Sequence, residues 1–317
     1  MKKLLILLLS VFLTACSTAG GDGVAITDAT SMKTGTEREE KQNTEQNTTQ
    51  KAGDFEPAAE VRLINPDGNT VQERIAVPDG YERIKAGAGS FGEYLRNLPL
   101  KPDGSAVRHY NGNIKPADVH VAVIDMDIGN RDLQQCADAV IRLRAEYLFG
   151  KGFYDRIHFN FTNGFRADYS TWRQGSRIRI DGNKAYWVKQ AESSTGYDSF
   201  RKYLDMVFSY AGTLSLSQEL EKVPPEDIRI GDVFIKGATP GHCVIVLDMA
   251  ENRDSGEKCF LLAQSYMPAQ DIHILKNPAN NDQNPWYQAD FGDTLVTPEW
   301  TFTADQLARF GDEPASE

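Results

Sequence analysis

A cysteine ahead of a long apolar-periodic segment and a histidine at the start of a later strand are the residues best suited to do chemistry. Cys136 lies in the stretch 132–138, and His242 follows Pro240 and Gly241 ahead of an apolar run. A thiol becomes more acidic near a helix N-terminus and beside an imidazolium, which makes such a pair a nucleophile and its base. We therefore expect Cys136 to attack a carbonyl carbon, and His242 to act first as base and then as acid.

A third side chain should orient the imidazole of His242. Asp248 shares its strand face, but six residues of strand span roughly 20 Å, so it lies too far away. Gln264, or Ser265 if the register shifts by one, is predicted to lie opposite His242 on the neighbouring strand. Gln264 is therefore expected to hold the ring.

An oxyanion hole needs hydrogen-bond donors next to the nucleophile. Gln134 and Gln135 immediately precede Cys136, and we expect Gln135 to supply such a donor.

A purely structural interpretation of both residues is also open. Cys136 shares a predicted helix face with Val140, Leu143 and Tyr147, and free cysteine is among the most buried residue types. His242 could simply end a strand. The first turn of the helix decides the matter, since a thiol outside it gains little from the helix dipole.

Other residue groups predict less chemistry. The remaining histidines are scattered and form neither a His-Glu-x-x-His nor a Cys-x-x-Cys pattern, so no metal and no cofactor are expected. Asp125 and Asp127 lack the rest of a calcium-loop spacing. A possible platform for stacking against sugars consists of four aromatic residues, Tyr169, Trp172, Tyr186 and Trp187, although aromatics in short strands more often belong to the core.

The elements that carry the cysteine and the histidine are a helix and a hairpin. Apolar residues recur at helical spacing through residues 133–149, with Arg142 and Glu146 four apart on a wetter face. Residues 242–248 and 259–265 flank a polar turn near Asp254 and predict an antiparallel hairpin. A turn there sets Cys243 far from Cys259, so both thiols should be free.

The rest of the chain alternates between helical and strand patterns, which predicts an α+β fold. We expect helices from Ser90 to Pro99, over residues 199–210 and after Thr303, and strands at 119–125, 157–162, 176–180, 185–188 and 233–235.

The first residues are typical of a bacterial lipoprotein signal. Lys2 and Lys3 precede a short apolar run, and residues 1–15 end just before Cys16, which is predicted to carry the lipid. The run is too short to span a bilayer. Residues 16–54 are polar and predict a tether, residues 55–312 one globular domain, and 313–317 a tail. The membrane, reached through Cys16, is the expected partner, and the expected location is the cell envelope, at the outer membrane, with the leaflet left open.

The charge of the chain is strongly acidic. The formal net charge is -11, and removing Lys2 and Lys3 with the signal would make it -13. This balance argues against binding to nucleic acid and to anionic lipid head groups.

Several segments carry a resemblance to known families. Residues 133–138, 142–148, 240–242, 262–270 and 297–300 resemble an uncharacterised lipoprotein family, a domain of unknown function in Gram-negative gut bacteria. Cys136 and the segment from Gly231 to His242 are similar, more weakly, to papain-like cell-wall cysteine peptidases. The second resemblance implies a papain-like core with insertions, in which a helix bearing the cysteine packs on an antiparallel sheet.

Together these patterns predict an envelope lipoprotein that is a cysteine hydrolase acting on peptidoglycan peptides or related amide bonds. The alternative is a non-catalytic envelope lipoprotein that binds glycan or a protein partner. An acyltransferase that uses the same pair of residues on lipids is a third interpretation.

Overall fold

The computed structural model describes residues 63–280 and 284–311. The predicted signal, the lipid-carrying Cys16 and the tether lie outside the described residues. Within the described part of the chain, no helix combines the length and the apolar character needed to cross a bilayer.

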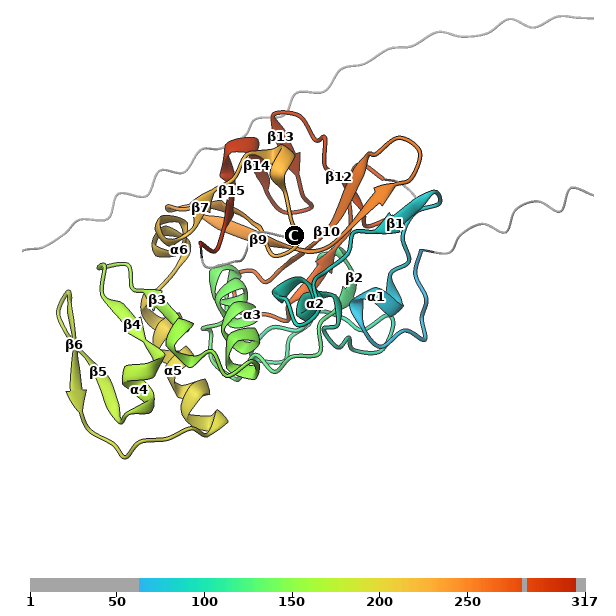
Figure 1. Cartoon of the computed structure of the whole chain (residues 1–317). Helices are drawn as coiled ribbons and strands as arrows, with labels where there is room; N and C mark the ends of the chain where they lie inside the picture. The colour runs from blue at the N-terminus through green and yellow to red at the C-terminus, as the bar shows by residue number, and fades with distance from the viewer. Residues whose placement is uncertain (1–62, 281–283, 312–317) are drawn as a thin grey trace, which may run out of the picture. The chain divides into compact units, whose positions relative to one another are not determined.

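An antiparallel sheet forms the centre of the fold (Figure 1). Its strands follow the order β2-β11-β10-β9-β8-β15-β7, while β1 also pairs with β9 and β12 with β10. The longest pair is the predicted hairpin of β9 and β10. The strand bounds are β1 Tyr81–Arg83, β2 His120–Val123, β7 Glu221–Lys222, β8 Val233–Lys236, β9 His242–Asn252, β10 Lys258–Gln264, β11 His273–Leu275, β12 Tyr287–Gln288 and β15 Leu307–Arg309.

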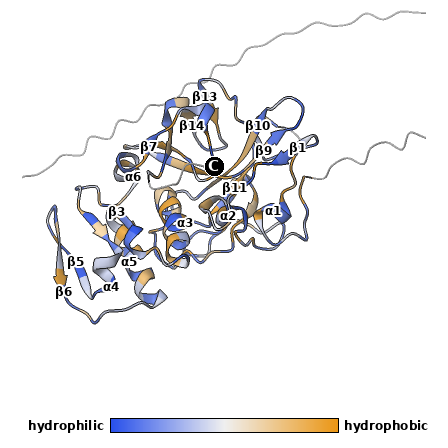
Figure 2. Ribbon diagram, viewed as in Figure 1, coloured by the Kyte–Doolittle hydropathy of each residue, from blue (hydrophilic) through white to orange (hydrophobic). Residues whose placement is uncertain are grey.

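Both faces of this sheet are buried, which explains why β9 is apolar almost without interruption. Side chains alternate along a strand, so Cys243 and Ile245 join the core on the side of the helices, while Val244 and Val246 join a second cluster on the other side. Figure 2 shows the central strands coloured mostly as apolar. The second face is covered by β13 (Thr294–Val296), β14 (Thr301–Thr303) and neighbouring loops.

Three helices pack in the core on the first face of the sheet, the face that carries Cys243 and Ile245. They are α1 (Val71–Arg74), α2 (Phe91–Arg96) and α3 (Cys136–Gly150). Ser90 caps α2 as predicted, because its hydroxyl accepts a 3.1 Å hydrogen bond from the backbone N–H of Glu93. α3 is the helix predicted over residues 133–149, but it begins three residues later. Its first residue is therefore Cys136.

Between α3 and β7 the chain forms a smaller lobe, seen at the lower left of Figure 1. Its predicted helix is confirmed as α5, whose buried residues are Phe200, Tyr203, Leu204, Val207 and Phe208. The elements of the lobe are β3 His158–Asn160, β4 Arg166–Asp168, α4 Tyr169–Arg173, β5 Ser176–Asp181, β6 Lys184–Lys189, α5 Tyr197–Tyr210 and α6 Thr213–Glu219.

The predicted α+β class is confirmed, but two details differ. The segment after Thr303 is a single 3-10 turn, Ala304–Gln306, that runs into β15 rather than a helix, because the strand pairs with β8. Arg142 is not on a wet face, since it is 2% exposed. Of the four aromatic residues of the possible sugar platform, Tyr169 and Trp172 are 0% and 4% exposed and pack in the lobe core, so they follow the favoured core interpretation and cannot stack against a sugar.

Candidate functional site

Cys136 lies at the first position of α3, where the helix dipole acts most strongly. The turn before it does not continue the helix, because Gln135 has extended backbone angles. The backbone N–H of Gln135 donates a 3.0 Å hydrogen bond to the carboxylate of Asp138, which fixes the start of the helix. Cys136 itself is 8% exposed.

The imidazole of His242 lies between Cys136 and Gln264. Its Nε2 is 2.8 Å from Oε1 of Gln264, and its ring hydrogen-bonds the thiol of Cys136. An amide oxygen only accepts, so Nε2 carries the proton and Nδ1 is left to accept one from the thiol. The three residues predicted as nucleophile, base and orienting group are thus brought together.

Glu299 sets the orientation of Gln264, and the sequence analysis assigned it no role. Nε2 of Gln264 donates to Oε2 of Glu299 at 2.6 Å. A carboxylate only accepts, so this contact turns Oε1 of the amide toward His242. Glu299 is held in turn by an ion pair of 2.7 Å with Lys115. The sequence signal was its place in the segment 297–300, one of those that carry the family resemblance.

His273, on β11, completes the network behind Gln264. Its Nδ1 is 2.9 Å from the carbonyl oxygen of Asp271, and its Nε2 is 3.3 Å from Nε2 of Gln264. The ring therefore donates at Nδ1 and accepts at Nε2, as a neutral histidine does. Burial lowers its pKa to about 3, which agrees with this neutral state.

The thiol of Cys136 is strongly acidified. Its pKa is lowered to about 5, chiefly by a hydrogen bond with the thiol of Cys243. Burial opposes this effect, whereas the hydrogen bond and charge of His242 and the backbone N–H of Ala137 add to it. Burial, together with the Cys136 thiolate, raises the pKa of Cys243, so Cys243 keeps the proton that it donates.

No disulfide joins Cys136, Cys243 and Cys259, as predicted for the last two. Cys259 lies opposite Ala250 in the hairpin, far along the strand from Cys243. The close contact between Cys243 and Cys136 was not foreseen, because it depends on how α3 packs on β9.

The predicted oxyanion donor, Gln135, is engaged elsewhere. Its Nε2 donates to Oδ1 of Asp132 at 3.0 Å. The backbone N–H of Cys136 is a second candidate donor, since the first N–H groups of a helix have no acceptor within it. A third is Gln134, whose buried Nε2 has no partner among the described residues.

Aromatic rings border the imidazole of His242. The ring centroids of Tyr266 and Trp300 lie 4.7 Å and 5.4 Å from it, and both residues are half-buried. Met267, next along the chain, is 60% exposed.

Metal ligands do not gather here. Across residues 63–280 and 284–311, no group of three or more His, Cys, Asp or Glu side chains could hold a metal ion.

The fold and this site define an α+β protein in which a helix-borne cysteine meets a strand-borne histidine at one end of an antiparallel sheet. Residues 71–309 match a family described as a domain of unknown function (4846), and the chain belongs to that family. Neither the curated proteins nor the solved structures gave a match.

Proposed function

We propose that this protein is a cysteine hydrolase with a papain-like core. The observation that carries the proposal is the continuous chain of contacts from the Cys136 thiol through His242 to Gln264. Such a chain activates a nucleophile and holds its base in one tautomer, which packing alone does not require.

The reaction would proceed by acyl transfer. His242 takes the thiol proton while Sγ of Cys136 attacks the carbonyl carbon, and the backbone N–H of Cys136 stabilises the oxyanion. His242 then gives its proton to the leaving amine, and the carbon–nitrogen bond breaks. Water, deprotonated by His242, attacks the thioester and releases a carboxylic acid, and the thiol is restored.

The proposed substrates are peptidoglycan peptides or related amide bonds. This choice follows from the lipoprotein signal ending before Cys16, which predicts an envelope protein anchored to the outer membrane, where such bonds are abundant. The strongly acidic chain fits an uncharged or cationic substrate better than a nucleic acid.

A second candidate function is a non-catalytic envelope lipoprotein that binds glycan or a protein partner. The low exposure of Cys136, 8%, favours it, because a binding protein can leave this thiol covered.

The rate of Cys136 alkylation by iodoacetamide, followed against pH, separates the two functions. The full chain is labelled, and peptide mass mapping identifies which cysteine reacts, so Cys243 stays in place. An activated pair gives fast labelling of Cys136 with a midpoint well below about 8.5, and His242→Ala should raise that midpoint and slow the labelling at pH 7, while Cys243 keeps part of the effect. Labelling that is indifferent to His242→Ala, whether fast or slow, would overturn the hydrolase. Cys259 serves as the internal control for unfolding, because burial raises its pKa to about 12.

A further inference from the structure

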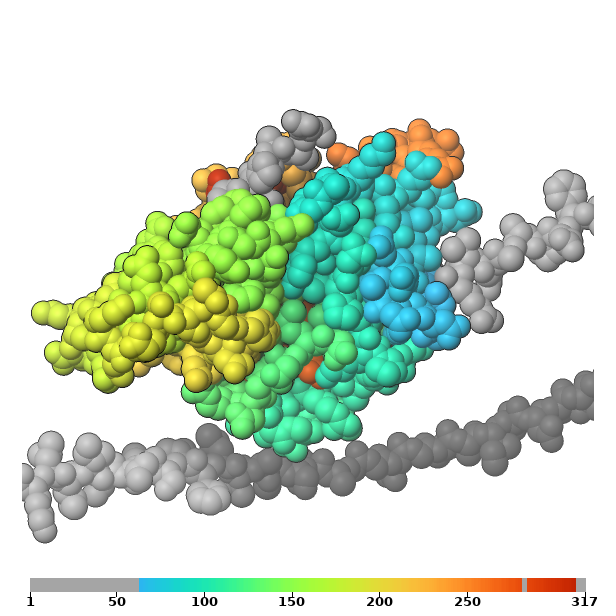
Figure 3. Space-filling model, turned by 60° about the horizontal axis from the view of Figure 1, so that its bottom comes forward, coloured from blue at the N-terminus to red at the C-terminus, as the bar shows by residue number. Residues whose placement is uncertain are grey.

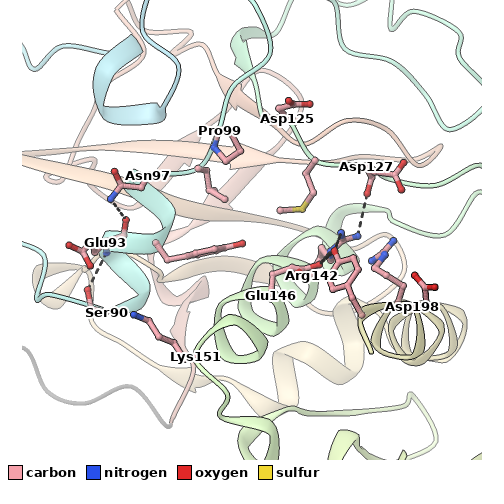
Figure 4. A pocket seen from close by; sticks show the side chains of 15 residues that line it. Ser90, Glu93, Asn97, Pro99, Asp125, Asp127, Arg142, Glu146, Lys151 and Asp198 are labelled. Carbon is pink, nitrogen blue, oxygen red and sulfur yellow. Dashed lines mark hydrogen bonds and ion pairs between the residues drawn. The ribbon is translucent and has the colours of Figure 1, made fainter. Parts of the chain in front are cut away.

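A second site is formed by an open cavity of about 730 Å³ between α2, α3, α5 and the loop after β2. Figure 3 shows the molecular face hollowed between the blue-green and the yellow segments, and Figure 4 shows the side chains that line the cavity. Cys136, His242 and Gln264 are not among these residues. The cavity is therefore distinct from the candidate active site, and its size suits a small ligand.

One wall of the cavity is acidic. Asp125 and Asp127 follow β2 and are both exposed, and Figure 4 shows their carboxylates on the loop above α3. Oδ1 of Asp127 accepts a 3.0 Å hydrogen bond from the N–H of Gly129, which leaves the other carboxylate oxygen for a ligand. An exposed carboxylate of this kind attracts an ammonium group.

Arg142 lines the cavity, but four of its five N–H donors are engaged within the protein. Nε donates to Glu146 at 2.6 Å, and Nη2 donates to the hydroxyl of Tyr197 at 3.1 Å. Nη1 donates to the backbone oxygen of Asp127 and to Oε1 of Gln134. This guanidinium holds the walls of the cavity together.

Arg201, on α5, is placed differently. It lines the cavity, and its Nη1 is buried without a hydrogen-bond partner among the described residues. Burial, and then the positive charge of Arg142, lower its pKa. A buried donor without a partner is costly. Because this nitrogen is closed to solvent, a carboxylate in the cavity would meet it only after the guanidinium turns toward the cavity, and would then form a charge-assisted hydrogen bond with it.

The cavity also has an apolar lining. Tyr94, Leu98, Pro99 and Met126 line the same cavity. The ligand that matches this arrangement carries an amine, a carboxylate and an apolar part.

We propose that this cavity binds an amino acid or short peptide with a free amine and a free carboxylate. Asp125 and Asp127 take the ammonium group, and Arg201 takes the carboxylate. The proposal does not depend on the proposed hydrolase, since a binding protein could use the same cavity.

Calorimetric titration of the full chain with alanyl-leucine tests the proposal. The free dipeptide should bind, and its N-acetylated and C-amidated forms should each bind about tenfold more weakly or worse, because each loses one charge-assisted contact. Absence of binding, or equal binding of all three peptides, would overturn the proposal. This comparison uses the unaltered protein, so it does not depend on whether a variant folds.

Two variants assign the contacts. Arg201→Gln should abolish the preference for the free carboxylate, and Asp125→Asn should reduce the preference for the free amine. Arg179→Gln and Asp181→Asn, exposed positions of the lobe that do not line the cavity, are the matched controls and should change nothing. Unchanged preferences in Arg201→Gln would contradict the assignment. Cys136→Ala should bind as the wild type does, whichever way the alkylation experiment ends.

Discussion

At the scale of single residues, the site depends on a thiol that is acidified by a neighbouring thiol. Cys136 and Cys243 share one proton, which stays on Cys243 because that side chain is fully buried and Cys136 is slightly exposed. His242 adds a second contact to the same sulfur. The thiolate is thus stabilised by two consecutive residues of β9.

Replacing Cys243 should therefore raise the pKa of Cys136. In Cys243→Ala the largest acidifying contact is gone, so the midpoint of iodoacetamide labelling should move from about 5 toward the ordinary thiol range. Cys259→Ala, a buried cysteine at a distant position of the neighbouring strand, is the control and should leave the midpoint in place. Equal midpoints in the two variants would show that the Cys243 contact does not acidify the thiol.

Glu299 is expected to act as a positioning residue. Glu299→Ala frees the amide of Gln264 to turn its Nε2 toward His242, which would weaken the base, and labelling of Cys136 at pH 7 should slow by roughly 3- to 10-fold. Glu299→Gln keeps an acceptor and should recover part of the rate. Glu192→Ala, an exposed position in the lobe, is the control. Identical pH profiles for Glu299→Ala and the control would exclude this role.

At the scale of elements, a buried carboxylate ties β1 and α2 to β9. Asp248 is 0% exposed, and it bonds Nε of Arg83 and Nε of Arg96, each at 2.7 Å. Asp248 was predicted to lie too far from His242 to orient it. In the structure it forms ion pairs with the two arginines instead.

Breaking this cluster should be strongly destabilising. Asp248→Asn leaves the buried guanidinium of Arg96 and the half-buried one of Arg83 without their charge partner, so the free energy of unfolding should fall by about 3–5 kcal/mol. Asp118→Asn breaks an exposed ion pair with Lys276 and should cost about 1 kcal/mol or less. Urea unfolding of both variants measures the difference. Similar losses of unfolding free energy in the two variants would mean that the ion pairs of Asp248 do not stabilise the fold.

Element types could be predicted from the sequence better than their ends and their pairing. The helical spacing of α3 and α5 and the alternation of β9 and β10 are local signals, and all four elements were predicted. The start of α3 was missed because the backbone N–H of Gln135 bonds the Asp138 side chain, a contact that hydrophobic periodicity does not reveal.

The candidate site shows the same division between local and distant contacts. His242 and Gln264 lie on one hairpin, and their contact was predicted, but the predicted register was wrong. Ala263 pairs with Ile245 after a bulge between Leu261 and Leu262, so Gln264 reaches His242 from a diagonal position and not from the opposite one. Glu299 and His273 reach the site through loops and through the pairing of β11 with β10, which the local pattern does not encode. The burial of Arg142 was missed for the same reason, because the residues that cover it lie on α5 and in the loop after β2, far away in the sequence.

At the scale of the whole molecule, the histidines of the site are buried, and this burial links the site to the stability of the fold. His273 is 0% exposed, and its pKa is lowered to about 3 by burial. Above about pH 6.5 the ring is neutral in both the folded and the unfolded chain, so it contributes no pH dependence. Below that pH the unfolded chain binds a proton that the folded protein does not.

Acid should therefore weaken the contribution of His273 to stability, starting well above the range where ordinary carboxylates titrate. This contribution to the free energy of unfolding should fall as the pH drops from 6.5 toward 3, with a slope of up to about 1.4 kcal/mol per pH unit. Glu219, whose pKa burial raises to about 7, acts in the opposite direction, so the contribution of His273 is measured as a difference between two variants. His273→Leu removes this pH-dependent contribution. At pH 7 the variant should be less stable than the wild type, because it lacks the hydrogen bonds of the imidazole. At pH 5 the difference in unfolding free energy between the two proteins should be smaller by about 2 kcal/mol. Urea unfolding at both pH values measures the gap, and a gap that stays constant would show that a different group controls the acid sensitivity.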